Sequence, residues 1–427
     1  MKKSLKKIIS VALTSMVMLT SLAGCSSSKT DSGTSGKPVT ITYAIWDKNQ
    51  EPGMRAIADA FTAKNPNIKV KIEVTNWDQY FTKLEAAATG GALPDVFWMH
   101  SNNFVKYASS GMLMDITDKV KNSKVISESN FPKGLVDSTI QDGKTYGLPK
   151  DYDTIGLWYN KAMFDKAKIP YPDGTWDWKK LQEVAKKLTD SSKEVYGFAA
   201  PEDAQQGYYN FIYQNKGTVI SKDKKKSGFD SAATKEAIQY DVDFSLKDKS
   251  SPTQAQFADT SFAAMFESGK VAMGLFGSWM VSEFKANDYV KANCDVAVIP
   301  QGKQKATVYN GLQNAVAAKS KYPEQSWKFL EFMGTKEANL IQAEKGAAIP
   351  AFKGTAQPWI DYSKGFNLKV FPEMLSYAVL VPTSTTAAKW KEYENDILKR
   401  VWTKELTVEE GCKQLAKQMN EALATEK

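Results

Sequence analysis

Two carboxylates separated by a single residue are the first candidates for chemistry. Asp151 and Asp153 follow Pro149, and in an extended segment residues i and i+2 lie on one face, so both carboxylates can face one site. Carboxylates accept strong hydrogen bonds from sugar hydroxyls. A glycoside hydrolase also needs two carboxylates, about 5–9 Å apart. The pattern leaves open a sugar-binding site, a surface hydrolase, and loop acids that cap a helix or turn.

Aromatic residues stand beside acids at predicted strand ends. Trp46 and Asp47 close one strand, and Trp279 comes shortly after another. A sugar presents apolar C–H faces and a rim of hydroxyls, which aromatic rings and polar side chains recognise in a cleft. We expect all three residues to contact a ligand, with a core position as the alternative for Trp279. Trp77 and Asp78 resemble this pattern, but they are interpreted as the start of a helix with the acid near its positive end.

Composition excludes several kinds of site. The chain has 427 residues, 42% of them hydrophobic and 24% charged, which is typical of a soluble globular protein. His100 is the only histidine, so a metal site built from several histidines is excluded and a His-dependent triad would require His100. Cys25, Cys294 and Cys412 lie too far apart for a zinc knuckle or a redox pair. We therefore expect no metal and no cofactor.

The N-terminal segment has the pattern of a secretory signal. Residues 1–24 combine four lysines with an apolar stretch too short for a good membrane span. They end in Leu22, Ala23 and Gly24 before Cys25, which resembles a bacterial lipoprotein box. The resemblance implies cleavage before Cys25 and lipid on its sulfur and on the new N-terminus. An ordinary secretory signal with a chance cysteine is the alternative.

Residues 25–38 are expected to be the lipidated cysteine and a flexible linker, because Ser, Gly, Thr and Lys dominate them. About 13 such residues reach about 20 Å on average. The folded part is thus predicted at the extracellular face of the cytoplasmic membrane. The formal charge of +8 includes the four signal lysines, so the remainder carries only +4. With this small charge, no nucleic-acid partner is expected, and the lysine cluster at 222–226 is interpreted as a solvated loop.

Alternating strands and helices must position the candidate residues. Residues 39–45, 68–74 and 95–99 predict strands, and helices are predicted from Pro52 and over 80–88. The order strand, helix, strand, helix, strand favours an open α/β sheet, and such sheets bind ligands at the carboxyl ends of their strands. His100 and Asn102 follow the third strand, so we expect them in the site. The alternative for His100 is a structural role in the core.

Further strands are predicted at 271–276 and 295–299. Helices are predicted at 325–333 and at 175–188, the second with Thr175 as its N-cap.

Several motifs together carry a family resemblance. The chain resembles the extracellular solute-binding proteins of ABC importers, in the carbohydrate-binding group similar to maltose-binding protein. Each motif alone is weak, but their order and spacing together are specific, and they cover essentially all of the chain after the signal. Besides the lipoprotein box, the motifs lie at residues 93–98, 142–149, 151–153, 157–161, 175–178, 269–273, 277–279, 310–311 and 349–351.

This resemblance implies a fold of two α/β lobes, the type II periplasmic-binding-protein-like fold. A ligand cleft lies between the lobes, and several hinge crossings are expected near residues 150, 310 and 355. The N-terminal lobe would comprise residues 39–150 plus 311–355. The C-terminal lobe would comprise residues 151–310 plus 356–427.

The resemblance also implies roles for individual residues. Asp153 stands where the family has an acid that pairs with sugar hydroxyls, and Trp279 where it has a ring that stacks on sugar. Asn102 and Asn103 depart from the acidic and basic residues common at these positions, which suggests a ligand other than maltose. Further ligand contacts are expected from the second lobe's aromatics and from the crossings, at Tyr208 or Tyr209, Asn310, Gly311 and Gly346.

The function implied is that of a lipid-anchored, monomeric, non-enzymatic protein. It would bind an extracellular mono- or oligosaccharide and deliver it to the membrane subunits of an ABC permease. The alternatives are the hydrolase that uses Asp151 or Asp153, a binding protein for a non-sugar solute, and an adhesin or sensor. In an oxidising location Cys294 and Cys412 could form a disulfide, or they could be two buried thiols. The sequence does not name the sugar.

Overall fold

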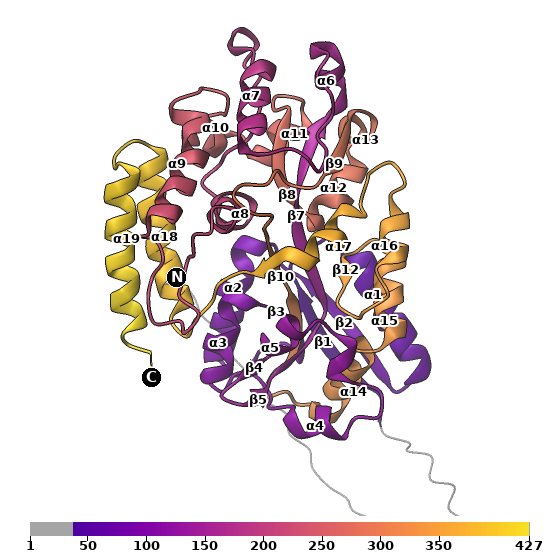
Figure 1. The fold of residues 1–427 in the computed structure, drawn as a ribbon. Coiled ribbons are helices and arrows are strands. Elements are labelled where there is room, and N and C mark those ends of the chain that lie inside the picture. Colours follow the sequence, from indigo (N-terminus) through magenta and orange to yellow (C-terminus); the bar gives the residue numbers. More distant parts are fainter. Residues whose placement is uncertain (1–36, 427) are drawn as a thin grey trace, which may run out of the picture. The chain divides into compact units, whose positions relative to one another are not determined.

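A computed structural model of the chain describes residues 37–426. The predicted signal sequence 1–24, Cys25 and the predicted linker up to residue 36 lie outside the described residues. Two large β-sheets, each covered by helices, form the described part (Figure 1).

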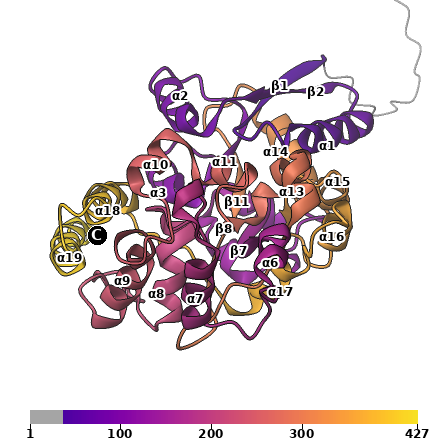
Figure 2. The same cartoon turned by 90° about the horizontal axis from the view of Figure 1, so that it is seen from above.

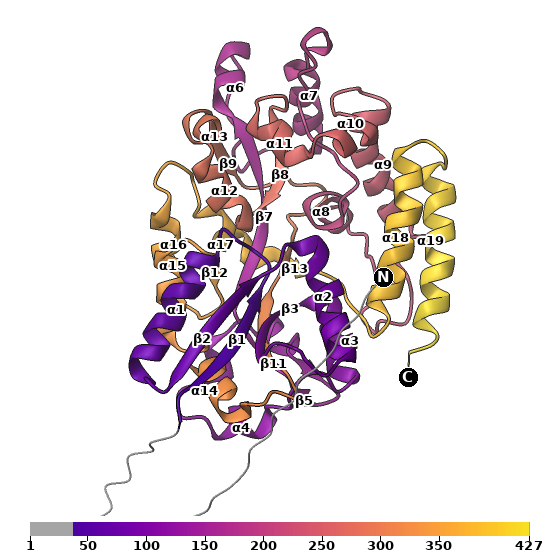
Figure 3. The ribbon, with the colours of Figure 1, turned by 180° about the vertical axis from the view of Figure 1, so that it is seen from behind.

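The first sheet has the strand order β2-β1-β3-β11-β6. The strands β1, β2 and β3 are parallel, whereas β11 runs antiparallel to both of its neighbours. The predicted order of strand and helix in an open α/β sheet is therefore confirmed for the first three strands, and helices α1 and α2 connect them, as Figure 3 shows. The bounds are β1 Val39–Ile45, α1 Glu51–Lys64, β2 Ile68–Val74, α2 Trp77–Thr89, β3 Val96–His100, β6 Gly147–Pro149 and β11 Leu312–Val316.

The second sheet is organised around one long strand, β7, which spans Asp151–Asn160. It contains the path β12-β7-β10-β13, and β8 and β9 also pair with β7. The other strands are β8 Met273–Gly277, β9 Cys294–Ala297, β10 Thr307–Asn310, β12 Ile349–Pro350 and β13 Ala378–Leu380. A separate hairpin joins β4 Ile140–Gln141 to β5 Lys144–Thr145.

Helices surround both sheets (Figure 2). The helix predicted over 175–188 begins later, at Trp178. Its N-cap is Asp177 rather than Thr175, because the Asp177 carboxylate accepts a hydrogen bond of 2.7 Å from the backbone nitrogen of Lys180.

The remaining α-helices are α3 Ser101–Ser109, α4 Thr117–Asn122, α5 Lys133–Asp137, α6 Lys161–Ala167, α7 Trp178–Leu188, α8 Tyr209–Gln214, α9 Ala232–Leu246, α10 Gln254–Asp259, α11 Phe262–Glu267, α12 Val281–Ala286, α13 Asp288–Asn293, α14 Pro323–Met333, α15 Lys336–Glu344, α16 Gln357–Tyr362, α17 Val370–Met374, α18 Ala387–Trp402 and α19 Val408–Leu423.

Each sheet has its own hydrophobic core, which makes the fold a two-lobed α/β fold. Tyr43, Trp98 and Phe329 belong to the core of the first lobe, and Trp158 and Trp390 to that of the second. The chain passes between the sheets where β6 leads into β7, where β10 leads into β11, and between α15 and β12. The carboxyl ends of β1 and β3 thus lie near the start of β7 and the end of β10.

Two further features bear on the sequence predictions. Cys294 and Cys412 are buried and unpaired, so the described structure has the two thiols rather than a disulfide. Between residues 37 and 426, no helix combines the length and the apolar character that crossing a bilayer requires.

Candidate functional site

Asn310 connects the strand ends of the two lobes. Its Nδ2 atom lies 2.7 Å from Nε2 of His100, and its Oδ1 atom accepts a hydrogen bond of 2.8 Å from the Ser101 hydroxyl. Its backbone nitrogen donates to Oδ1 of Asp153 at 3.0 Å. Three predicted site residues, His100, Asp153 and Asn310, are therefore brought into direct contact.

Asp153 is held by Gln205 as well. The Gln205 side-chain nitrogen donates to Oδ1 of Asp153 at 2.8 Å, the same oxygen that Asn310 uses. Burial, with a further contribution from the charge of Asp151, raises the pKa of Asp153 well above its ordinary value. A half-buried carboxyl with hydrogen bonds on one oxygen is suited to bind a hydroxyl with the other.

Gln205 comes from a π-helical turn, Ala204–Tyr208, which no sequence pattern predicted. The next residue, Gln206, accepts a hydrogen bond of 3.1 Å from the backbone nitrogen of Gly277 at the end of β8. A side chain on Gly277 would come within 2.0 Å of the Trp279 ring, so a glycine is required for the ring to fold back over this strand end. Trp279 is partly exposed there, at the carboxyl end of its strand as predicted.

The first lobe contributes a cluster of aromatic rings. Trp46 lies at its centre, with ring centroids 5.3 Å from Trp77, 5.1 Å from Tyr80 and 5.0 Å from Trp98. The Trp77 ring lies 5.2 Å from His100 and is 46% exposed. The sequence interpretation of Trp77 as a helix start is confirmed, since α2 begins there, but the ring also belongs to the site, which the prediction missed.

Asp47 lies at the start of the loop before α1. Its carboxylate accepts hydrogen bonds from the backbone nitrogen of Asn49 at 2.8 Å and from the side chain of Gln50 at 2.9 Å. Its charge adds to burial in raising the pKa of Glu283, which lies on α12 just after Trp279. The Asp47 loop of the first lobe is therefore close enough to α12 of the second for the two carboxylates to interact.

Asp151 has a different environment from Asp153. The Nζ atom of Lys150 lies 2.5 Å from Oδ2 of Asp151, and both side chains are buried. The other oxygen accepts from the backbone nitrogen of Leu312 at 3.1 Å. Asp151 is thus engaged in a buried ion pair at a crossing between the sheets.

Tyr208 and Tyr209 are buried beneath the site. Their hydroxyls donate to the two carboxylate oxygens of Glu394 on α18, at 3.0 and 2.8 Å, and their side chains are 0% and 1% exposed. These contacts hold α8 against α18. Contact of either ring with a ligand stays a prediction that this geometry does not favour.

Gly346 and Gly311 are backbone positions with little space around them. Gly346 follows α15 with a φ of +66°, and a side chain there would collide with Tyr362 at 2.2 Å. Its carbonyl accepts from the Ser282 hydroxyl at 3.0 Å, which connects α15 to α12. Gly311 forms the crossing from β10 to β11, and a side chain there would meet Leu135 at 2.3 Å.

Lys391 on α18 is a further residue that the sequence did not predict. Its ammonium donates to Oδ1 of Asn102, the predicted site residue on α3 of the other lobe. Burial lowers the pKa of Lys391, and burial together with its charge lowers the pKa of His100 to about 3. His100 is therefore a neutral imidazole at physiological pH. No motif surrounds Lys391, and the only sequence signal was the helical periodicity of α18.

The site contains aromatic rings, amides and carboxylates. Between residues 37 and 426, no cluster of three His, Cys, Asp or Glu side chains has an arrangement that could hold a metal ion. Rings on both lobes and polar groups between them can stack on and hydrogen-bond a hydroxylated ligand.

Comparison with known proteins gives consistent matches. A family model described as bacterial extracellular solute-binding protein matches residues 47–340. Among solved structures, an ABC substrate-binding protein of Listeria monocytogenes in complex with cycloalternan is 28% identical with a TM-score of 0.86, covering 91% of this chain and 100% of that one. An ABC transporter solute-binding protein of Thermotoga lettingae bound with alpha-D-tagatose is 25% identical with a TM-score of 0.79, again covering 91% and 100%. A maltodextrin-binding protein of Bacillus subtilis is 26% identical over 343 residues, which is 77% of this chain and 76% of that protein.

Proposed function

Because the chain belongs to the bacterial extracellular solute-binding protein family, we propose that it binds a sugar outside the cell and delivers it to the permease of an ABC importer. The similar proteins named above are described with cycloalternan, tagatose or maltodextrin as ligands, which supports a sugar here. The observation that carries the proposal is the chain of contacts from His100 through Asn310 to Asp153 where the two sheets join. The rings of Trp46 and Trp77 lie beside His100.

An oligosaccharide is the proposed cargo. The rings come from two separate places, Trp46 and Trp77 from the first lobe and Trp279 from the second. Two stacking surfaces on different lobes can hold different rings of one extended ligand. Asn102, Gln205 and Lys391 add neutral and positive groups for the hydroxyls between them.

Binding without turnover is favoured over hydrolysis. The second carboxylate that a hydrolase would need near Asp153 is Asp151, and Lys150 and the backbone of Leu312 occupy both of its oxygens. Incubation of the protein with oligosaccharides, followed by product analysis, tests this point. Released sugar that depends on Asp153 would establish the hydrolase instead.

The lobes are proposed to close on the ligand by rotation about the crossings. Their limits are proposed as residues 39–150 plus 311–348 and residues 151–310 plus 349–427; the boundary expected at 355 is moved back because β12, Ile349–Pro350, pairs with β7 of the second sheet. Hinge closure is a known motion of two-lobed binding proteins, and the closed form would be the one that the permease recognises. The protein is proposed to act as a monomer.

Anchoring through lipid on Cys25 is proposed from the sequence alone. A linker of about 13 residues would let the folded part move about 20 Å from the outer face of the cytoplasmic membrane. Membrane fractionation of cells that express the wild type or Cys25→Ala tests the anchor. The wild type should sediment with membranes and the variant should be released.

The first experiment for the function is thermal unfolding with a panel of ligands. Mono- and oligosaccharides are compared with amino acids, polyamines and phosphate. A ligand at 100 times its dissociation constant stabilises the folded state by about 2.7 kcal/mol, which gives a clear shift in Tm. A shift with one group of sugars supports the proposal and begins to define the cargo, and a shift with the other solutes alone would contradict it.

A further inference from the structure

One face of α9 carries buried polar atoms without partners. Asp241 and Ser245 are four residues apart, so they lie on the same face of the helix, and their exposed fractions are 0% and 1%. Among the described residues, neither carboxylate oxygen of Asp241 nor the hydroxyl of Ser245 has a hydrogen-bond partner. Buried polar atoms are nearly always satisfied, so three of them together indicate a binding site.

The π-helical turn Ala204–Tyr208 packs against this face. A side-chain atom on Gly207 would lie 3.3 Å from Oδ2 of Asp241, 3.5 Å from the carbonyl oxygen of Pro201 and 4.0 Å from Cβ of Asp203. These three residues therefore surround a point that Gly207 leaves without a side chain. The Asp203 carboxylate caps the turn, with Oδ1 accepting from the backbone nitrogen of Gln206 at 2.7 Å.

Asp203 and Asp241 both approach Gly207, Asp203 with its Cβ atom and Asp241 with its Oδ2 atom. Among the ion pairs of the described residues, none involves Asp203 or Asp241. Buried charges without a partner are costly, and a bound cation removes that cost.

We propose that Asp203, Asp241, Ser245 and the Pro201 carbonyl bind one calcium ion. All four groups offer oxygen atoms, the ligands that hard cations such as calcium prefer. Two carboxylates balance a divalent charge, and calcium accepts carbonyl and hydroxyl oxygens in irregular geometry, whereas magnesium demands a near-ideal octahedron. Calcium sites in extracellular modules have dissociation constants of about 10⁻⁴–10⁻³ M, which fits a protein that works outside the cell.

The calcium ion would stabilise the segment that carries Gln205 and Gln206. Those side chains bind Asp153 and the backbone of Gly277 in the candidate sugar site, and neither is among the groups proposed to hold the ion. Calcium should therefore bind in the absence of sugar. The test of the calcium site is for this reason independent of the test of the proposed function.

The experiment is equilibrium dialysis of the purified, chelator-treated protein against about 1 mM calcium, with metal analysis of the retained protein. The wild type should retain one calcium ion per chain and Asp241→Asn should lose it. The matched control is Asp243→Asn, two residues along α9, whose carboxylate pairs with Lys247 instead. This control should bind like the wild type.

The outcomes separate the alternatives. The proposal would be overturned if the wild type retained no calcium, or if it retained magnesium equally well when magnesium alone is present. In that case the partner of the Asp241 carboxyl would be a buried water, or the carboxyl would be protonated and donate to the Pro201 carbonyl. Retention of calcium by Asp241→Asn would overturn the proposal as well. If Asp241→Asn does not fold, Ser245→Ala takes its place and should weaken calcium binding severalfold.

Discussion

The side-chain amide of Asn310, at the end of β10, lies 2.7 Å from the Nε2 atom of His100, at the end of β3. The same amide accepts hydrogen bonds from the hydroxyl of Ser101 and from the backbone nitrogen of Gly311. One buried side chain thus connects a strand of the second lobe with the strand and helix of the first. Any rotation of the lobes about this crossing has to preserve or exchange these contacts.

Asn310→Ala should destabilise the protein. The substitution leaves His100 and the Ser101 hydroxyl without their partner in a buried place, and an unsatisfied buried group costs about 1–3 kcal/mol. We expect a loss of about 2 kcal/mol in the free energy of unfolding, measured by urea titration, and weaker sugar binding. Asn395→Ala, at an exposed position on α18, is the control and should change the free energy by less than about 0.5 kcal/mol. If both substitutions changed the free energy of unfolding equally little, the Asn310 contacts would contribute nothing to stability.

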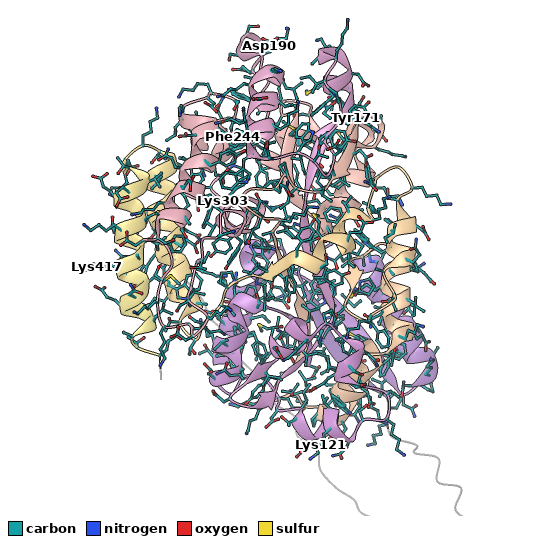
Figure 4. All side chains as sticks on the ribbon, viewed as in Figure 1. Lys121, Tyr171, Asp190, Phe244, Lys303 and Lys417 are labelled. Carbon is teal, nitrogen blue, oxygen red and sulfur yellow. The ribbon has the colours of Figure 1, made fainter. Side chains whose placement is uncertain are left out.

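Trp279→Ala should weaken sugar binding at least tenfold, or about 1.4 kcal/mol, while the fold stays intact. The partly exposed ring lies at the end of β8 and would lose its stacking surface. Titration calorimetry with the sugar found in the thermal panel measures the affinity. Tyr171→Ala is the matched aromatic control, since Tyr171 is 39% exposed and lies near α6, away from β1 and β3 (Figure 4). Unchanged affinity of Trp279→Ala would assign this ring to packing.

Trp77→Ala tests the contribution of the first lobe. The exposed ring beside His100 should provide a second stacking surface, and its removal should cost about 1 kcal/mol of binding, about fivefold in the dissociation constant. Trp77→Phe keeps an aromatic face and should recover most of the loss. If both variants bind like the wild type, the ligand contacts only the second lobe, and an oligosaccharide that spans both lobes is not the cargo.

The fold of the first lobe was predictable because its signals are local. Strict alternation over 68–74 and the apolar run before His100 predict strands without reference to any other part of the chain, and both are confirmed. The helix predicted from Thr175 begins three residues later, because Asp177 competes as an N-cap and its carboxylate reaches the backbone of Lys180. Which of two neighbouring residues becomes the N-cap depends on the conformation of the backbone before the helix, and the sequence alone does not give that conformation.

The site was predictable only in part, because some of its contacts are made across the fold. His100 was expected in the site because it follows a predicted strand, whereas Asp153 and Asn310 were expected from the family resemblance. Lys391 reaches Asn102 from 289 positions away in the sequence, and Gln205 reaches Asp153 from an unusual helical turn. Neither residue carries a local pattern that indicates its partner. Asp151 was grouped with Asp153 by spacing, but the neighbouring Lys150 turns it into a structural ion pair.

Lys150→Met should be among the most destabilising single substitutions at the crossings. The ammonium of Lys150 also donates to Oε1 of Gln50 at 2.9 Å and lies 4.3 Å from the centre of the Trp98 ring. Its removal leaves Asp151 as a buried charge without a partner, which costs about 3–5 kcal/mol. Urea unfolding measures the loss.

The control for Lys150 is Lys133→Met, which removes the exposed ion pair with Asp137 on α5. Exposed pairs of this kind contribute about 0–1 kcal/mol, so this variant should unfold almost like the wild type. A small effect at both positions would contradict the view that Asp151 depends on Lys150. It would return Asp151 to the list of candidate ligand contacts.

Glu394 should make the stability of the protein depend on pH. Burial raises the pKa of this carboxyl in the folded state above its ordinary value of 4.5, so the folded protein keeps a proton that the unfolded chain releases. The free energy of unfolding should therefore decrease as the pH rises from about 4.5 towards the raised pKa. Other groups titrate in the same range, so the prediction concerns the difference between variants.

Glu394→Gln removes this titration and keeps a hydrogen-bonding group for Tyr208 and Tyr209. Across that pH range, its free energy of unfolding should decrease less than that of the wild type, as measured by urea titrations at a series of pH values. Glu392→Gln, exposed on the same helix, should follow the wild-type profile. If the Glu394→Gln profile runs parallel to the wild type, Glu394 is ionised in the folded state, and its two tyrosines and Lys391 hold it as a carboxylate.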